Sequence, residues 1–172
     1  AEEGVVFHTN INVGVDISTD EIINLHDAVI LAGGAEMPRD LPIQGRNFKG
    51  IHYAMDFLPQ QNRRVSNESY KNPEEILATS KNVVVIGGGD TGSDCIGTSI
   101  RQGAVSVTQL EIMPAPPEKE DKLSTWPNWP LKMRTSSSQE EGANREFSVM
   151  TQSFEGDTNG NVNKLHCIKV DN

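Results

Sequence analysis

The pattern of apolar and polar positions predicts alternating strands and helices. Residues 83–86 form a run of β-branched apolar side chains, and residues 90–102 follow with apolar positions at helical spacing. A second strand-like run covers residues 105–113. A strand, a helix and a second strand in this order predict a βαβ unit with parallel strands, and therefore an α/β fold.

The N-terminal part of the chain shows a similar alternation. Residues 5–8 are typical of a strand, and Ser18 and Glu21 have the spacing of a capping box at the start of a short helix. Residues 27–32 form an apolar run typical of a buried parallel strand. These elements predict a second piece of α/β structure.

The segments on either side of the βαβ unit have different patterns. Residues 59–82 are polar and predict a surface segment, with one short helix over Pro73–Leu77, where Pro and two acids suit a first turn. Residues 147–154 and 162–170 alternate apolar and polar positions around the turn-rich residues 156–160. This alternation predicts a β-hairpin.

A long connection separates the βαβ unit from the hairpin. Residues 114–145 are rich in Pro, Ser and charge and show little apolar periodicity, so we expect a long excursion from the sheet. Trp126 and Trp129 could anchor this excursion or form a surface for a partner. We expect anchoring, because a long loop needs hydrophobic contacts.

Composition excludes several classes of function. The net charge of -9 over 172 residues, with no stripe of Lys and Arg, argues against nucleic acid as a partner. No apolar run is long enough to span a bilayer, so we expect a soluble, cytoplasmic protein without membrane contact. Cys95 and Cys167 form neither a C-x-x-C pair nor a metal cluster, and the four histidines are scattered. We expect reduced structural thiols, with Cys95 in the core, and no metal site.

A glycine-rich turn carries the candidate chemistry. Gly87, Gly89 and Gly92 form a G-x-G-x-x-G motif between the predicted strand and helix, which is the context that a dinucleotide site requires. The free N–H groups at the start of the helix can bind pyrophosphate. Asp90 and Thr91 are candidates either for capping the helix or for ligand contact. The positions predicted to contact the nucleotide are Gly87, Gly88, Gly89, Asp90, Thr91 and Gly92.

Glu111 follows the second predicted strand, where an acid that binds the nucleotide ribose belongs. Such an acid accepts hydrogen bonds from the 2'-hydroxyl and repels a 2'-phosphate, so the local chemistry favours NADH. A solvated glutamate at the end of a strand is the alternative.

Several longer stretches resemble the small (beta) subunit of glutamate synthase, a flavoprotein related to the pyridine nucleotide-disulfide oxidoreductases. The resemblance covers essentially the whole chain, and the Trp and Ser stretches are more specific than the glycine motif. The stretches are Met37–Pro42, Gly50–Leu58, Val85–Cys95, Ser106–Pro114, Trp126–Pro130, Thr135–Gly142 and the final hairpin.

This resemblance implies a protein that binds FAD and NAD(P)H in two interleaved Rossmann-like domains. A hydride passes to the flavin, and electrons go through iron-sulfur clusters to a large subunit, which makes glutamate from glutamine and 2-oxoglutarate. Residues 1–50 then match the tail of the FAD-binding domain, and residues 51–172 match an NAD(P)-binding domain that is incomplete at its C-terminal end. Members of the family use NADH or NADPH, so the resemblance leaves that choice open.

The resemblance also implies residues beside the flavin. Ala32, Gly33 and Gly34 match a strand ending in Ala-Thr-Gly that lines the FAD site, with Gly33 in place of the threonine. The implied contact set extends to Ala35 and Arg39. The threonine's hydroxyl contact has no counterpart here.

Two alternative functions remain open. One is an electron-input subunit of a related complex, such as a dihydropyrimidine dehydrogenase-like or hydrogenase-like module, although the Trp and Ser stretches weigh against it. The other is a nucleotide-binding module without turnover. Disulfide reduction is disfavoured, because no pair of redox cysteines occurs in the sequence.

In the resembling flavoproteins, the glycine turn for FAD and the cluster cysteines lie upstream of this region, and the closing FAD segment lies downstream. We therefore expect that the chain by itself retains no FAD and has no glutamate synthase activity. Absorbance spectroscopy of the purified chain after dialysis tests this expectation, and a flavin spectrum would contradict it.

Overall fold

The computed structural model describes residues 3–35, 37–68 and 74–171. The chain divides into two compact units, residues 1–36 and residues 37–172.

The first unit contains one helix among its described residues, α1 (Thr19–Leu25). The hydroxyl of Ser18 accepts a hydrogen bond from the backbone N–H of Glu21 at 3.1 Å, which confirms the Ser18 half of the predicted capping box. The strands predicted over residues 5–8 and 27–32 do not form in this unit. Ile30 and Leu31 are 89% and 94% exposed, because an apolar strand becomes buried only between paired neighbours, and the described part of this unit supplies none.

The second unit is built on the predicted βαβ arrangement, which the structure confirms. Strand β1 (Asn82–Ile86) leads into helix α3 (Gly89–Arg101), and the chain returns in strand β2 (Ser106–Leu110). The strands β1 and β2 pair in parallel, with Asn82 opposite Ser106 and Ile86 opposite Leu110. The α/β fold class is therefore correct.

A third parallel strand, β3 (Asn144–Glu146), pairs with β2 and completes the order β1-β2-β3. No pattern in the sequence predicts this strand. Its three residues, Asn-Arg-Glu, carry no apolar alternation. Only pairing with the neighbouring strand makes this segment a strand.

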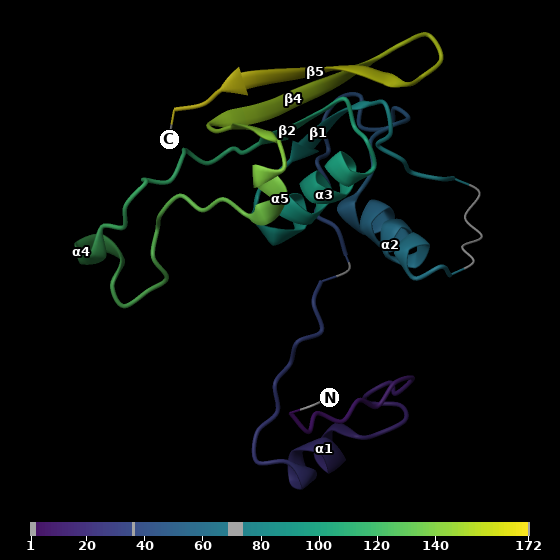
Figure 1. The fold of residues 1–172 in the computed structure, drawn as a ribbon, viewed down its shortest axis with the longest axis vertical. Coiled ribbons are helices and arrows are strands. Elements are labelled where there is room, and N and C mark those ends of the chain that lie inside the picture. Colours follow the sequence, from purple (N-terminus) through teal and green to yellow (C-terminus); the bar gives the residue numbers. More distant parts are fainter. Residues whose placement is uncertain (1–2, 36, 69–73, 172) are drawn as a thin grey trace. The chain divides into compact units, whose positions relative to one another are not determined.

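Helices cover one side of the sheet. Helix α3 lies between α2 (Ala54–Val65) and the short helix α5 (Ser137–Glu140), as Figure 1 shows. Phe57 from α2, Cys95 from α3 and Ala78 form the buried core cluster. Burial alternates along β1, so that Val83 and Val85 pack against this cluster.

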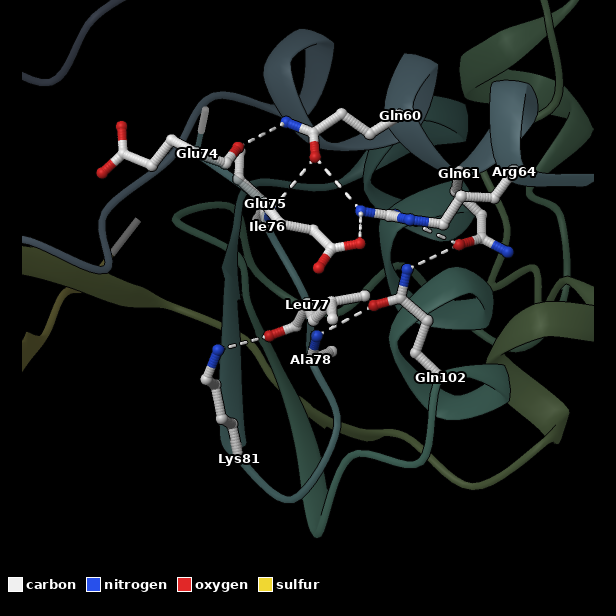
Figure 2. Close-up of polar contacts among 10 residues, drawn as sticks. All are labelled: Gln60, Gln61, Arg64, Glu74, Glu75, Ile76, Leu77, Ala78, Lys81 and Gln102. Atoms are coloured by element: carbon white, nitrogen blue, oxygen red, sulfur yellow. Dashed lines mark hydrogen bonds and ion pairs between the residues drawn. The ribbon is translucent and has the colours of Figure 1, made fainter. Parts of the chain in front are cut away.

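The helix predicted over residues 73–77 is wrong for residues 74–77, and Pro73 lies outside the described residues. Residues 74–78 instead form neither helix nor strand, and side-chain amides hold their backbone (Figure 2). Gln60 donates to the carbonyl of Glu74 and accepts from the N–H of Ile76, and Gln102 accepts from the N–H of Ala78 at 2.8 Å. These side-chain amides replace hydrogen bonds that a helix would have made.

The predicted hairpin is confirmed. Strand β4 (Val149–Gly156) pairs antiparallel with β5 (Val162–Lys169). The carboxylate of Asp157 accepts hydrogen bonds from the backbone N–H groups of Asn159 and Asn161, which closes the turn and lowers the pKa of Asp157.

None of the helices in the described part of the chain has the length and hydrophobicity that a membrane span requires.

The excursion does not pack through its tryptophans. It contains helix α4 (Lys122–Thr125), and the side chains of Trp126 and Trp129 are each 78% exposed. The guanidinium of Arg134 lies 4.3 Å from the ring centre of Trp129. The expectation that these rings anchor the excursion is therefore wrong, because α5 makes the contact with α3 instead.

The two cysteines should differ sharply in reactivity. Burial, with the charge of Asp94 as the smaller cause, raises the pKa of Cys95 to about 11, whereas Cys167 is exposed. Only the thiolate reacts, and at pH 8 roughly one Cys95 thiol in a thousand is ionised. We expect iodoacetamide to label only Cys167 in the folded chain, as measured by mass spectrometry. Cys167→Ser is the control and should take up label only after unfolding, so rapid labelling of this folded variant would contradict the structure.

Candidate nucleotide site

The glycine turn between β1 and α3 adopts a backbone that requires glycine. Gly87 and Gly89 have φ angles of 107° and 81°, in the region that side chains with a Cβ rarely adopt. The N–H of Gly87 donates to the carbonyl of Leu110 at 2.9 Å. The turn is thereby tied to the neighbouring strand β2.

The third glycine of the motif lets the helix approach the strand. Gly92 is buried, and a Cβ at this position would lie 2.9 Å from the carbonyl oxygen of Gly87. Any side chain would therefore push the first turns of α3 away from the end of β1. This is the close helix–strand packing that the motif predicts for its third glycine.

The start of α3 is open to a ligand. Its N-cap residue is Gly88, and no side-chain cap hydrogen bond is made there by any residue the structure describes. Asp90 and Thr91 lie in the first turn and are exposed, so neither acts as the cap. The first N–H groups of a helix have no partner within the helix, and they favour an anion at this end.

Glu111 lies directly against this turn. A Cβ on Gly88 would be 2.6 Å from Oε2 of Glu111, which places the carboxylate beside the N-cap of α3. Its Oε1 accepts from a terminal nitrogen of Arg145 at 3.2 Å, and the two side chains are only 20% and 18% exposed. Glu111 is predicted from the sequence, whereas Arg145, which lies in β3 at the end of the excursion, is not.

Arg145 is held from several sides. It donates to the carbonyl of Arg134 at 3.0 Å, and its guanidinium lies 4.9 Å from the ring centre of Phe147. Its Nε is buried without a hydrogen-bond partner among the described residues. The side chain is therefore fixed next to the carboxylate rather than free in solvent.

The residues predicted to line the flavin are divided between the two units. Gly33, Gly34 and Ala35 belong to the first unit and are exposed, whereas Arg39 belongs to the second unit and is exposed there. Contact of these residues with FAD stays a prediction.

A separate hollow of about 440 Å³ lies along α2. Burial lowers the pKa of His52, one of the residues that line it. None of the predicted site residues lines this hollow. Among residues 3–35, 37–68 and 74–171 there is also no group of three or more His, Cys, Asp or Glu side chains that could hold a metal ion.

Comparisons with known proteins relate the chain to glutamate synthases. It is 48% identical over 171 residues to the glutamate synthase (NADPH) small chain of Mycobacterium tuberculosis, which covers 98% of this chain and 35% of that protein. It is 43% identical over 178 residues to the glutamate synthase (NADH) of Schizosaccharomyces pombe, covering 99% of this chain and 8% of that protein. The chain is also 40% identical over 176 residues to the glutamate synthase (NADPH) small chain of Bacillus subtilis, and the alignment covers 99% of this chain and 36% of that protein.

The chain therefore spans about a third of the length of the bacterial small chains that it matches. Among solved structures, a mutant of FprA from Mycobacterium tuberculosis aligns with a TM-score of 0.48 and 17% identity, covering 91% of this chain and 46% of that chain. The family model for pyridine nucleotide-disulphide oxidoreductase matches residues 3–129, which is more than half of the chain. The glycine turn, the parallel strands on either side of α3 and this match agree, and the chain belongs to the pyridine nucleotide-disulphide oxidoreductase family.

Proposed function

We propose that this chain is the nicotinamide-nucleotide-binding part of a glutamate synthase small chain. The observation that carries the proposal is the glycine turn at the start of α3 with Glu111 packed against it, in a chain 48% identical to such a small chain. Hydride transfer from NAD(P)H to FAD is the corresponding reaction.

The geometry of the turn fits a dinucleotide. The uncapped first turn of α3 offers backbone N–H groups to the pyrophosphate, and the absence of a Cβ at Gly88 makes room for the carboxylate of Glu111 beside the turn. Glu111 accepts a hydrogen bond from the adenosine ribose. When bound, the nicotinamide supplies the hydride and the flavin accepts it, while the residues of this chain bind and orient. No side chain is required as an acid, base or nucleophile.

The wider assembly belongs to the same proposal. FAD contacts residues 32–35 and Arg39, and residues 1–50 form the tail of the FAD-binding domain, while residues 51–172 belong to the nicotinamide domain. Electrons pass through iron-sulfur clusters held outside this chain to the large subunit of a cytoplasmic enzyme. The names of the bacterial relatives, which are small chains of glutamate synthase, support the large subunit as partner.

The choice of nucleotide depends on Glu111 and Arg145. The relatives include proteins named for NADPH and for NADH, so their names do not decide it. The carboxylate of Glu111 is positioned at the turn and would repel a 2'-phosphate, whereas Arg145, 3.2 Å away, would attract one if the carboxylate were neutral. We infer that the intact pair favours NADH.

Glu111→Gln tests this role. The substitution keeps the size of the side chain but removes its charge, so we expect NADH to bind about tenfold more weakly, since a hydrogen bond to a charged group contributes about 1.5 kcal/mol or more. NADPH binding should strengthen, because Arg145 becomes available to the 2'-phosphate. Isothermal titration of both nucleotides into the chain measures the two affinities.

Glu118→Gln is the matched control for Glu111→Gln, because Glu118 is an exposed acid of the excursion. It should leave both affinities unchanged. If NADPH binds better than NADH to the native chain and Glu111→Gln changes neither affinity, the role given to Glu111 is wrong. If the native chain binds neither nucleotide, the proposed function itself is wrong.

Gly92→Ala tests the close packing behind the turn. The added Cβ would lie 2.9 Å from the oxygen of Gly87, so we expect a loss of about 1 to 3 kcal/mol in the free energy of unfolding, and weaker nucleotide binding. Urea denaturation and titration measure the two effects. Asp94→Ala, at an exposed position of the same helix, should change the stability by no more than about 0.5 kcal/mol. Equal behaviour of the two variants would contradict the packing argument.

A further inference from the structure

The end of the excursion is attached to the helix that follows the glycine turn. The hydroxyls of Ser93 in α3 and Ser136, the N-cap of α5, lie 2.5 Å apart. A Cβ on Gly97 would lie 2.9 Å from Cβ of Ser138, so α5 approaches α3 closely at this point. Arg101 and Glu141 form an ion pair across the same two helices. The serine-rich segment is therefore packed against α3 and is not a free loop.

From this position α5 reaches the glycine turn through two amide side chains. Gln109 on β2 is completely buried, and its Nε2 donates to the carbonyl of Gly87 at 3.2 Å. Its Oε1 accepts from Nε2 of Gln139 at 2.9 Å. The Oε1 of Gln139 in turn accepts from the N–H of Ser136 at 2.9 Å. We call this chain of hydrogen bonds, from Ser136 through Gln139 and Gln109 to Gly87, the amide relay.

The amide relay acts on the atoms that a nucleotide would meet. The N–H of Gly87 is held by the carbonyl of Leu110, and its C=O is held by Gln109. The C=O of Gly87 and the N–H of Gly88 share one trans peptide plane and point in opposite directions. Holding the carbonyl of Gly87 therefore also fixes the direction of the N–H of Gly88, the N-cap residue of α3.

We propose that Gln109 and Gln139 are positioning residues of the nucleotide site, which preset the direction of the Gly88 N–H without touching the nucleotide. The proposal rests on the proposed function, because it assumes a dinucleotide at the glycine turn. Buried polar groups are costly when unpaired, so a completely buried glutamine beside a glycine turn is retained only with both ends of its amide bonded. Gln109 meets this condition only because Gln139 arrives from the far end of the excursion.

Leucine substitutions of the two glutamines test the amide relay. Gln109→Leu keeps the size of the side chain but releases the carbonyl of Gly87, and we expect the nucleotide to bind about three- to tenfold more weakly, the loss of one hydrogen bond. Gln139→Leu should weaken binding by a similar factor through Gln109. If the two residues act in series, the double variant binds no more weakly than Gln109→Leu alone.

Gln102→Leu is the matched control. Gln102 is a partly buried glutamine, as Gln139 is, and both ends of its amide are bonded, to the N–H of Ala78 and to Gln61 (Figure 2). It is the C-cap of α3, at the other end of the helix from the turn. It should lower the melting temperature about as much as the other two variants, and leave the nucleotide affinity unchanged. In NMR spectra, the amide resonance of Gly88 should move in Gln109→Leu and Gln139→Leu but not in Gln102→Leu.

The outcomes separate the two proposals. A native chain that binds neither NADH nor NADPH overturns the proposed function, and the positioning role falls with it. A native chain that binds, with Gln109→Leu and Gln139→Leu binding equally well, overturns the positioning role alone. The positioning role is also overturned if Gln102→Leu weakens nucleotide binding as much as Gln109→Leu and Gln139→Leu do, because the loss of affinity then reflects general destabilisation.

Discussion

The close approach of α3 to the end of β1 is the contact on which the second unit depends. Gly92 leaves no room for a side chain between the helix and the carbonyl of Gly87. This contact sets where α3 begins, and so where its unpaired N–H groups lie. It also allows Cys95 and Ile96, on the next turn, to be buried against the sheet. The position of the helix N–H groups and the packing of the core therefore both depend on the contact between Gly92 and Gly87.

The excursion is attached to the second unit by its last residues, which its composition does not predict. Its exposed tryptophans do not anchor it, but its last residues do, through α5 and then through β3. Both elements bring polar side chains to the glycine turn, Gln139 from α5 and Arg145 from β3. Part of the candidate site is thus supplied by a segment that follows the G-x-G-x-x-G motif by about fifty residues.

In the first unit, an apolar pattern typical of a strand does not produce a strand. Residues 27–32 have the composition of a buried parallel strand, yet they form no strand and are exposed in this unit. The pattern reports which face prefers burial, but a strand also needs neighbours with which to exchange hydrogen bonds. For residues 74–77 it is the helix prediction that is wrong. The buried side-chain amide of Gln60 bonds the backbone groups of Glu74 and Ile76, so these groups are paired without a helix.

The sequence by itself determined the βαβ unit, the glycine turn, the capped helix α1 and the hairpin. Each is encoded over a few neighbouring residues, by apolar period, by a positive φ or by a capping side chain. Only the tertiary structure decided that Asn144–Glu146 is a strand, that Glu111 pairs with Arg145, and that Gln139 reaches Gln109. These contacts join residues about thirty or more positions apart, and no local pattern records which distant polar group will complete a buried hydrogen bond.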